Sequence, residues 1–212
     1  METQRDNFFL WGDSSKEYFD ISERVVDIQW NNIIIPFLGE NINTMNSTWA
    51  VDLACGRGRW TEKLKDHFKY IYAVDVNYEN VKYCLERFKG RGVYTQLTDG
   101  YHIPVFNESA GFIFCFDAMV HFDEDVIINY LKDAFRVLEK GGKAFFHHSN
   151  YYDSKESTGV NITLNPHWRN IMTQERFKVL AEEAGFTIEK QEIISWGDVE
   201  NLDCLTLLKK EK

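Results

Sequence analysis

The stretch VDLACGRG, residues 51–58, decides how this chain is expected to fold. It continues a short apolar run that begins at Trp49, and it contains two glycines, Gly56 and Gly58. Glycine lets the backbone turn tightly and pass close against a ligand, because it carries no Cβ atom. A helical pattern, RWTEKLKDHF, follows at once. An apolar strand, a glycine loop and a helix in this order are typical of nucleotide-type sites in α/β proteins.

Beyond this loop the chain alternates between short apolar runs and patterns of helical period. Apolar strands without polar alternation are expected in a parallel sheet that is covered on both faces. Their alternation with helices predicts a doubly wound α/β domain. The predicted strands are residues 49–55, 70–76, 93–97, 112–116, 143–148, 187–196 and 204–210, and the predicted helices between them are 59–68, 80–88, 125–138 and 173–185.

We expect a single domain over residues 1–212, because no repeat, low-complexity tract or composition change marks a linker. Its α/β core is predicted over residues 48–212, and residues 1–47 form an N-terminal helical segment. Apolar residues recur at helical spacing from Ile21 onward, so this segment should contain an amphipathic helix that ends near Pro36.

The helix predicted at 173–185 has clear ends. Thr173 is a plausible N-cap, Met172 and Phe177 are spaced for a hydrophobic staple, and Gly185 is placed to close the helix. The 24 residues before Thr173, 149–172, show no periodicity. Loops this long in compact domains are usually functional lids or disordered, and the aromatic residues here favour a lid.

Carboxylates follow the predicted strands. Asp75 ends the second strand, where a carboxylate can accept hydrogen bonds from both hydroxyls of a ribose. A dinucleotide site would carry a third glycine where this chain has Thr61, so NAD and FAD are disfavoured. With Asp52, Asp99 and Asp117 the strand ends would surround a ligand that has ribose hydroxyls, an adenine amino group and positive charge. S-adenosylmethionine has all three.

At this point the sequence resembles the class I S-adenosylmethionine-dependent methyltransferases, of the small-molecule type 11 and type 25 kind. The resemblance covers about residues 48–208. It implies a Rossmann-like, seven-stranded, mostly parallel sheet with an antiparallel last strand, and an N-terminal helical lid. The matching segments are VDLACGRG as glycine loop, AVDV as ribose strand, LTDG as adenine-side turn, FIFCFDAMVHF as fourth motif and RVLEKGGKAFF before the fifth strand.

The resemblance also implies roles for single residues. The loop would line the methionine end of the cofactor, Asp75 would bind the ribose, Asp99 would reach the adenine amino group, and Asp117 would lie near the methionyl part. Asp52 has two interpretations: it reaches the cofactor ammonium through water, or it is a structural carboxylate that holds the loop. The implied cofactor-binding residues are Asp52, Ala54, Gly56, Gly58, Asp75, Val76, Asp99, Gly100 and Asp117.

Methyl transfer from a sulfonium needs an aligned nucleophile and the exclusion of water. An alcohol acceptor must also lose a proton, for which a histidine with a near-neutral pKa is suitable. His121 follows the fourth strand by one turn and is our first candidate for this base, with a packing role as the alternative. His147 and His148 end the fifth strand, where only one of two neighbours can face the site. We predict that His148 does, with Asn150 beside it.

The predicted function is O-methylation of a sugar, a sugar nucleotide or another hydroxylated small molecule. The segments HHSN and NPHWRN resemble bacterial methyltransferases associated with surface polysaccharides. N-methylation of a small amine, methylation of RNA or protein, and a non-catalytic cofactor-binding protein are the alternatives. The predicted substrate contacts are Tyr18, Asn150, Trp168 and Arg169.

The amino-acid composition indicates which kinds of partner the chain is expected to have. The formal net charge of −9 counts against a nucleic-acid partner, since phosphate binding needs clustered Lys and Arg. We find no apolar run of membrane-spanning length and no signal peptide, so a cytoplasmic location is expected. We expect a monomer or a homodimer. The four cysteines form no CxxC pair and are expected to be reduced. No histidine or carboxylate pattern has typical ligand spacing, so no metal site is predicted.

Overall fold

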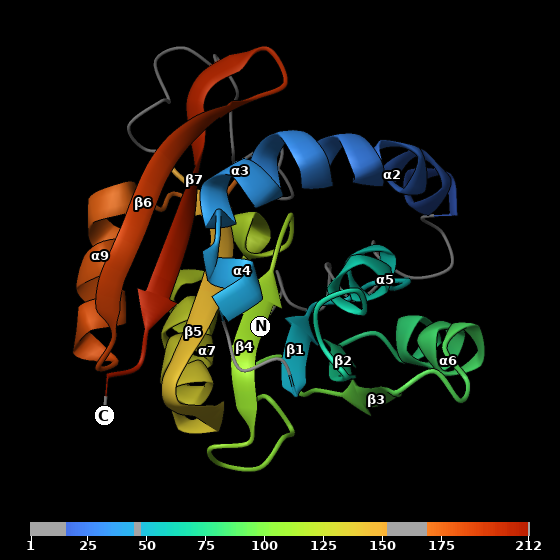
Figure 1. Cartoon of the computed structure of the whole chain (residues 1–212). Helices are drawn as coiled ribbons and strands as arrows, with labels where there is room; N and C mark the ends of the chain where they lie inside the picture. Colours follow the sequence, from blue (N-terminus) through green and yellow to red (C-terminus); the bar gives the residue numbers. More distant parts are fainter. Residues whose placement is uncertain (1–15, 45–47, 152–168, 212) are drawn as a thin grey trace.

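A seven-stranded sheet forms the centre of the computed structural model, which describes residues 16–44, 48–151 and 169–211 (Figure 1). The strand order is β3-β2-β1-β4-β5-β7-β6. β7 runs antiparallel to both of its neighbours, whereas the other pairs are parallel, which confirms the predicted α/β class and the antiparallel last strand. The strands are β1 (Trp49–Leu53), β2 (Tyr70–Asp75), β3 (Val93–Leu97), β4 (Ala110–Cys115), β5 (Leu138–Ser149), β6 (Thr187–Trp196) and β7 (Val199–Lys209).

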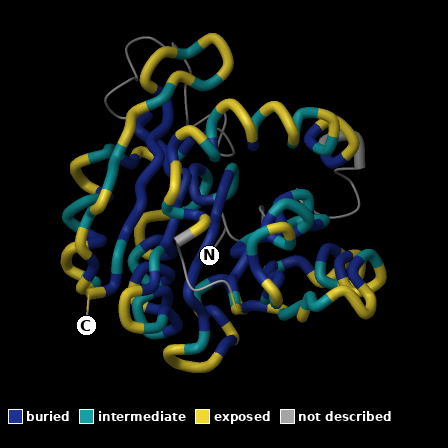
Figure 2. The backbone as a smooth tube through the Cα atoms, in the orientation of Figure 1, coloured by how far each residue is buried: buried dark blue, intermediate teal, exposed yellow. Residues whose placement is uncertain are grey.

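Helices cover both faces of this sheet, so that the central strands lie buried between them, whereas the edge strands β3 and β6 are partly exposed (Figure 2). Helices α7 and α9 pack on one face, and the N-terminal helices with α5 pack on the other. The described helical elements are α2 (Lys16–Gln29), the π-helical turn η2 (Trp30–Ile34), α3 (Ile35–Leu38), α4 (Asn41–Thr44), α5 (Arg59–Leu64), α6 (Tyr78–Arg87), the 3₁₀ turn η3 (Met119–His121), α7 (Glu124–Val137) and α9 (Gln174–Glu183).

The strand β4 shows why the apolar runs in the sequence predict this arrangement. All six of its residues are buried. Ile113 belongs to the core cluster under α7 and α9, while Phe112 and Phe114 belong to the cluster under η2 and α5. Successive side chains of a strand point to opposite faces, so a strand covered on both sides needs apolar residues at every position.

The N-terminal helix differs from the prediction at its end. Helical structure continues through the π turn into α3 and ends at Leu38, two residues beyond the predicted end near Pro36. Pro36 lies in the first turn of α3, a position that tolerates a residue without an N–H group. The π turn buries Trp30 and Ile34 against the sheet, which fixes this segment by packing.

Helix α9 has the predicted ends. The Thr173 hydroxyl accepts a hydrogen bond from the Arg176 N–H at 3.0 Å, and Gly185 follows the helix with φ +103°. Met172 and Phe177 are both buried in the core cluster of this face. Among the described residues, no helix is both long and apolar enough to cross a membrane.

Candidate functional site

A cavity opens at the carboxyl ends of β1, β2 and β4, where the strand order reverses from one side of β1 to the other. Open α/β sheets bind ligands at such reversal points. The cavity encloses about 1140 Å³, the open space at its mouth included. The residues that line it come from α2 (Phe19, Ser22, Glu23), the loop after β1 with the start of α5 (Ala54, Cys55, Gly56, Arg57, Arg59, Trp60), the ends of β2 and β3 with the start of α6 (Asp75, Val76, Asn77, Asn80, Thr98, Gly100) and the segment after β4 with the first half of α7 (Phe116, Asp117, Ala118, His121, Phe122, Asp123, Val126, Tyr130).

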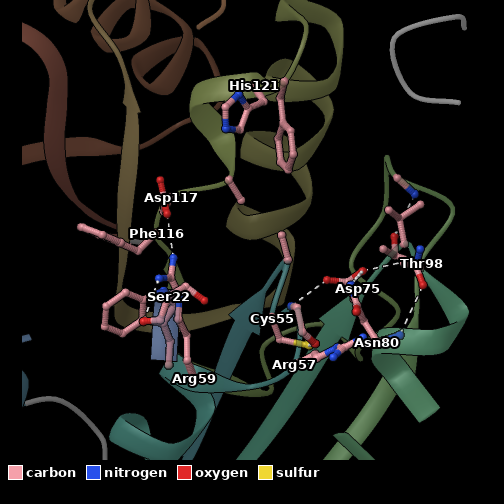
Figure 3. A pocket seen from close by; sticks show the side chains of 18 of the residues that line it. Ser22, Cys55, Arg57, Arg59, Asp75, Asn80, Thr98, Phe116, Asp117 and His121 are labelled. Atoms are coloured by element: carbon pink, nitrogen blue, oxygen red, sulfur yellow. Dashed lines mark hydrogen bonds and ion pairs between the residues drawn. The ribbon is translucent and has the colours of Figure 1, made fainter. Parts of the chain in front are cut away.

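Asp75 ties the end of β2 to the glycine loop. Its Oδ2 accepts the Gly56 N–H at 2.8 Å, and its Oδ1 accepts the Asn77 N–H at 2.8 Å and the Asn80 side-chain amide at 3.3 Å. Burial raises the pKa of this carboxyl, and the hydrogen bonds from backbone N–H groups and from the Asn80 side chain oppose that rise. The carboxylate lies in the cavity wall, where Figure 3 draws Asp75 beside Thr98.

Two of the three left-handed residues in the glycine loop line the cavity. Ala54 has φ +59° and Gly56 has φ +53°, and both line the cavity as predicted. A non-glycine residue in this region costs roughly 1–2 kcal/mol, which indicates that the surrounding contacts hold Ala54 in place. A Cβ added at Gly56 would lie 3.2 Å from the Phe19 ring of α2, so the loop and the N-terminal helix are closely packed.

Gly58 has a different role from the one predicted. It does not line the cavity, but is the N-cap of α5 with φ +83°. A Cβ at this position would lie 2.4 Å from Cε2 of Phe88, the residue that ends α6. Gly58 is therefore required for the close packing of α6 against the loop.

The structure places Asp52 under the loop rather than in the cavity. Its carboxylate is almost fully buried and accepts a 2.5 Å hydrogen bond from the Thr61 hydroxyl. Of the two interpretations of Asp52, this contact supports the structural one. Thr61, which stands where a dinucleotide site has its third glycine, is thus the partner of Asp52. Burial raises the pKa of Asp52 to about 7, against the Thr61 hydrogen bond.

Asp99 also differs from the prediction. Its side chain is more than half exposed and does not line the cavity. It caps its own turn, because it accepts the N–H groups of Tyr101 and His102 and pairs with the His102 ring at 2.7 Å. The neighbours Thr98 and Gly100 line this end of the cavity instead.

Asp117 and Arg59 form an ion pair inside the cavity, on the side opposite Asp75 in Figure 3. The distance from Arg59 Nη2 to Asp117 Oδ2 is 2.7 Å, and both side chains are nearly buried. The other guanidinium nitrogen lies 3.5 Å from the Ser22 carbonyl oxygen and from Gln29 Oε1, both on α2. Arg59 therefore links the glycine loop, the end of β4 and the N-terminal helix.

His121 ends the 3₁₀ turn η3 and lines the cavity, as the sequence predicts. Its N–H donates to the Ala118 carbonyl at 3.0 Å, which fixes the turn that follows β4. Figure 3 shows its ring above the space between Asp117 and Asp75. The ring is partly exposed, so it can exchange protons with a ligand or with water.

The prediction that His148 faces the site is wrong. Its ring is fully buried on the opposite face of the sheet, where it stacks on Phe177 with 3.7 Å between ring centroids. Its nitrogens contact the Ser149 carbonyl and the Thr206 hydroxyl, and burial lowers its pKa to about 3. A neutral ring without access to the cavity cannot act there as a base. Neighbouring strand residues do face opposite ways, but His147 is the one on the cavity side.

Two of the predicted substrate contacts are structural. The Asn150 side-chain oxygen accepts the Gln174 N–H at the start of α9, and its amide donates to the Asn201 carbonyl. Arg169 makes two 2.8 Å bonds to the carboxylate of Asp203. Neither side chain lines the cavity. The predictions for Trp168 and for the side chain of Tyr18 lie outside the described residues.

Comparison with known proteins identifies the class of enzyme. The Methyltransferase domain family matches residues 50–142, which include the glycine loop, Asp75 and the segment after β4. Residues 50–142 therefore form a methyltransferase domain, and the fold of the chain is that of the class I S-adenosylmethionine-dependent methyltransferases. S-adenosylmethionine is its methyl donor. No curated protein matches the sequence.

Solved structures share the fold of this methyltransferase at low identity. An S-adenosylmethionine-dependent methyltransferase from Clostridium acetobutylicum is 18% identical with a TM-score of 0.73, covering 94% of this chain and 100% of that one. One from Mesorhizobium loti is 13% identical with a TM-score of 0.69, covering 87% and 99%. A chain in the structure of a Haloferax volcanii complex between the Trm112 methyltransferase activator and a putative methyltransferase is 13% identical with a TM-score of 0.65, covering 91% of this chain and 95% of that one.

Several cavity residues of the methyltransferase were not predicted from its sequence. Phe19, Ser22 and Glu23 reach the cavity because α2 crosses over the glycine loop, and the contact of Ser22 with Arg59 joins residues 37 positions apart. The helical spacing of the apolar residues in this segment predicted an amphipathic helix, but not which of its residues face the cavity. Tyr130 comes from the first half of α7, where the period of apolar residues indicated a core position.

Proposed function

We propose that this methyltransferase methylates a hydroxyl group of a small polar metabolite, such as a sugar or a sugar nucleotide, with His121 as the general base. The observation that carries the proposal is that His121 lies in the same cavity as Asp75. S-adenosylmethionine supplies an activated methyl group when bound. The chain then has to bind it, orient an acceptor oxygen and take up one proton.

The two ends of the cavity suit the two ends of the cofactor. We assign the ribose to Asp75, whose carboxylate lies in the cavity wall, and the adenine to the wall formed by Thr98 and Gly100. The ion pair of Arg59 and Asp117 offers one positive and one negative group at the other end. A guanidinium binds a carboxylate and a carboxylate binds an ammonium, so this pair fits the amino-acid end.

The acceptor would enter between α2 and the segment after β4. Trp60, Phe116 and Phe122 line this part of the cavity with aromatic rings, and α2 covers it. Apolar walls exclude water from the transferring methyl group, and a covered cavity has room for a small acceptor only. We therefore propose that α2 acts as a lid. Within the described residues, Arg57 and Arg59 are the only Lys or Arg side chains of the cavity wall, too few for a nucleic-acid groove.

The proposal is tested by methyl transfer from isotopically labelled S-adenosylmethionine to fractionated metabolite pools. With an accepted substrate, His121→Ala should lower turnover about 10²-fold to 10⁴-fold, the usual contribution of a general base, while the cofactor affinity stays within about twofold. His102→Ala is the matched control, because His102 is exposed and pairs with Asp99 outside the cavity. Wild-type turnover in His121→Ala would reject the assignment of the base.

The same assay separates the alternatives. A labelled product that carries the methyl group on nitrogen would indicate a small-amine methyltransferase, since a neutral amine needs no base to lose a proton first. Label in RNA or protein would contradict the small-molecule proposal. Cofactor binding in calorimetry without transfer to any pool would favour a non-catalytic binding protein.

A further inference from the structure

His147 contacts the wall of the cavity from behind. It is fully buried and does not line the cavity itself. Its ring lies 4.4 Å from the ring of Phe116, and its Nδ1 accepts the N–H of Asp117 at 3.1 Å. Phe116 and Asp117 are neighbours on the wall beside Arg59 (Figure 3). One buried side chain thus touches two consecutive residues of the site.

The backbone at Asp117 needs such support. Asp117 has φ +61°, a left-handed conformation that is unfavourable for a residue other than glycine. This conformation turns the chain out of β4 and presents the carboxylate to Arg59 at 2.7 Å. Strained conformations of this kind persist only where surrounding contacts hold them, and the hydrogen bond to His147 is such a contact.

A second set of contacts fixes the His147 ring. Its Nε2 lies 3.0 Å from Oδ2 of Asp203 on β7, and Asp203 in turn binds Arg169 through both carboxylate oxygens. A backbone N–H can only donate, so Nδ1 is the unprotonated acceptor and Nε2 carries the proton that Asp203 accepts. Burial would raise the pKa of Asp203, but the hydrogen bonds from His147 and Arg169 and the charge of Arg169 lower it. The carboxylate therefore stays ionised and holds the ring in one tautomer.

We propose that His147 is a positioning residue of this methyltransferase: held by Asp203, it fixes the Asp117 backbone and the Phe116 ring so that the Asp117 carboxylate meets the ligand. The inference rests on the proposed function, in which Asp117 and Arg59 bind the amino-acid end of the cofactor. It adds a chain of contacts from Asp203 on β7 through His147 to the cavity wall, which we call the relay. Only Asp117 and Phe116, at its end, would contact the ligand.

Two variants separate positioning from ordinary core stability. In His147→Asn the side-chain oxygen stands near the place of Nδ1 and can still accept the Asp117 N–H, but the side chain is too short for Asp203. In His147→Gln the amide reaches the place of Nε2 and can still donate to Asp203, but no acceptor remains for Asp117. Each variant therefore keeps one of the two contacts.

The measurements are the thermal midpoint and the dissociation constant of S-adenosylmethionine for each variant. We expect His147→Gln to bind the cofactor about tenfold more weakly, the effect of losing one hydrogen bond of about 1.4 kcal/mol. His147→Asn should bind within about threefold of wild type although its midpoint falls further, since it leaves buried Asp203 without one donor. Affinities that follow the thermal midpoints in both variants would overturn the proposal.

Asp117→Ala distinguishes the two proposals. If Asp117→Ala binds the cofactor as wild type does, the assignment of Asp117 in the proposed function fails. If Asp117→Ala binds weakly while His147→Gln binds normally, only the positioning role fails. A measurement on the wild type avoids unfolded variants: in ¹⁵N-histidine spectra, S-adenosylhomocysteine should shift the Nδ1 resonance of His147, and an unchanged resonance beside a shifted Asp117 amide would contradict the relay.

Discussion

Replacing Asp52 with asparagine should stabilise the fold at neutral pH and remove part of its pH dependence. Burial raises the pKa of this carboxyl from 3.8 to about 7, the Thr61 hydrogen bond opposes the rise, and the charge of Asp75 adds to it. With a raised pKa, the folded chain binds more protons than the unfolded chain between about pH 4 and pH 7. The contribution of Asp52 to stability is therefore full below about pH 4 and is lost as the pH rises through 7.

The size of the effect follows from the shift. One pKa unit corresponds to about 1.4 kcal/mol, and most of the shift of Asp52 lies above pH 5. Between pH 5 and pH 8 the free energy of unfolding of the wild type should lose roughly 2 to 3 kcal/mol through this group. Asparagine does not ionise in this range, and its side-chain oxygen still accepts the Thr61 hydroxyl. The advantage of Asp52→Asn over wild type should grow by the same amount.

The assay is urea unfolding of both proteins at pH 5, 6, 7 and 8. The difference between them is the quantity to compare, because other groups such as Asp203 and His148 titrate identically in the two chains. Asp198→Asn is the control for the loss of one carboxylate, since Asp198 is exposed in the turn between β6 and β7, away from Asp52. A difference for Asp52→Asn that stays constant within about 0.5 kcal/mol, or shrinks with pH, would refute the reasoning.

Two further predictions concern the loop. Gly58→Ala should destabilise the fold by about 2 to 4 kcal/mol, because its Cβ would collide with the Phe88 ring at a left-handed φ. Gly90→Ala, with a similar φ and open space around it, should cost only about 1 kcal/mol in the same urea titration; equal losses would exclude the collision. Asp75→Ala should abolish measurable calorimetric binding of S-adenosylmethionine and leave the Gly56 N–H without its acceptor; unchanged affinity would remove Asp75 from the site.

The fold could be predicted because its signals are local. Each strand that is buried on both faces is a short apolar run in the sequence, as β4 shows. The tight turn after β1 is predicted by Gly56 and Gly58, which both adopt a left-handed φ. The cap of α9 is a similar case, since Thr173 bonds a backbone N–H only three residues away. The N-terminal helix passes Pro36 by two residues, because Pro36 lies in the first turn of α3, where a residue without an N–H group is tolerated.

The roles of the carboxylates near the strand ends were harder to predict than their positions along the chain. Asp52, Asp75 and Asp99 all follow or end strands, yet only Asp75 lines the cavity. Asp52 is turned under the loop by a hydroxyl nine residues away, and Asp99 is held at the surface by its own turn. A strand end fixes where the backbone goes, but the first turn after it decides the direction of the side chain.

The two adjacent histidines of β5 show where local reasoning stops. The period of a strand requires that His147 and His148 face opposite ways, and they do. Which of the two faces the cavity depends on which helices cover each side, and that is decided by contacts such as His147 with Asp203, 56 residues later. The strand that carries Asp203 pairs with β5 in an antiparallel register, so its carboxylate reaches the ring from the same face. A buried histidine acquires its role from a long-range ionic partner, and the sequence around it does not contain that partner.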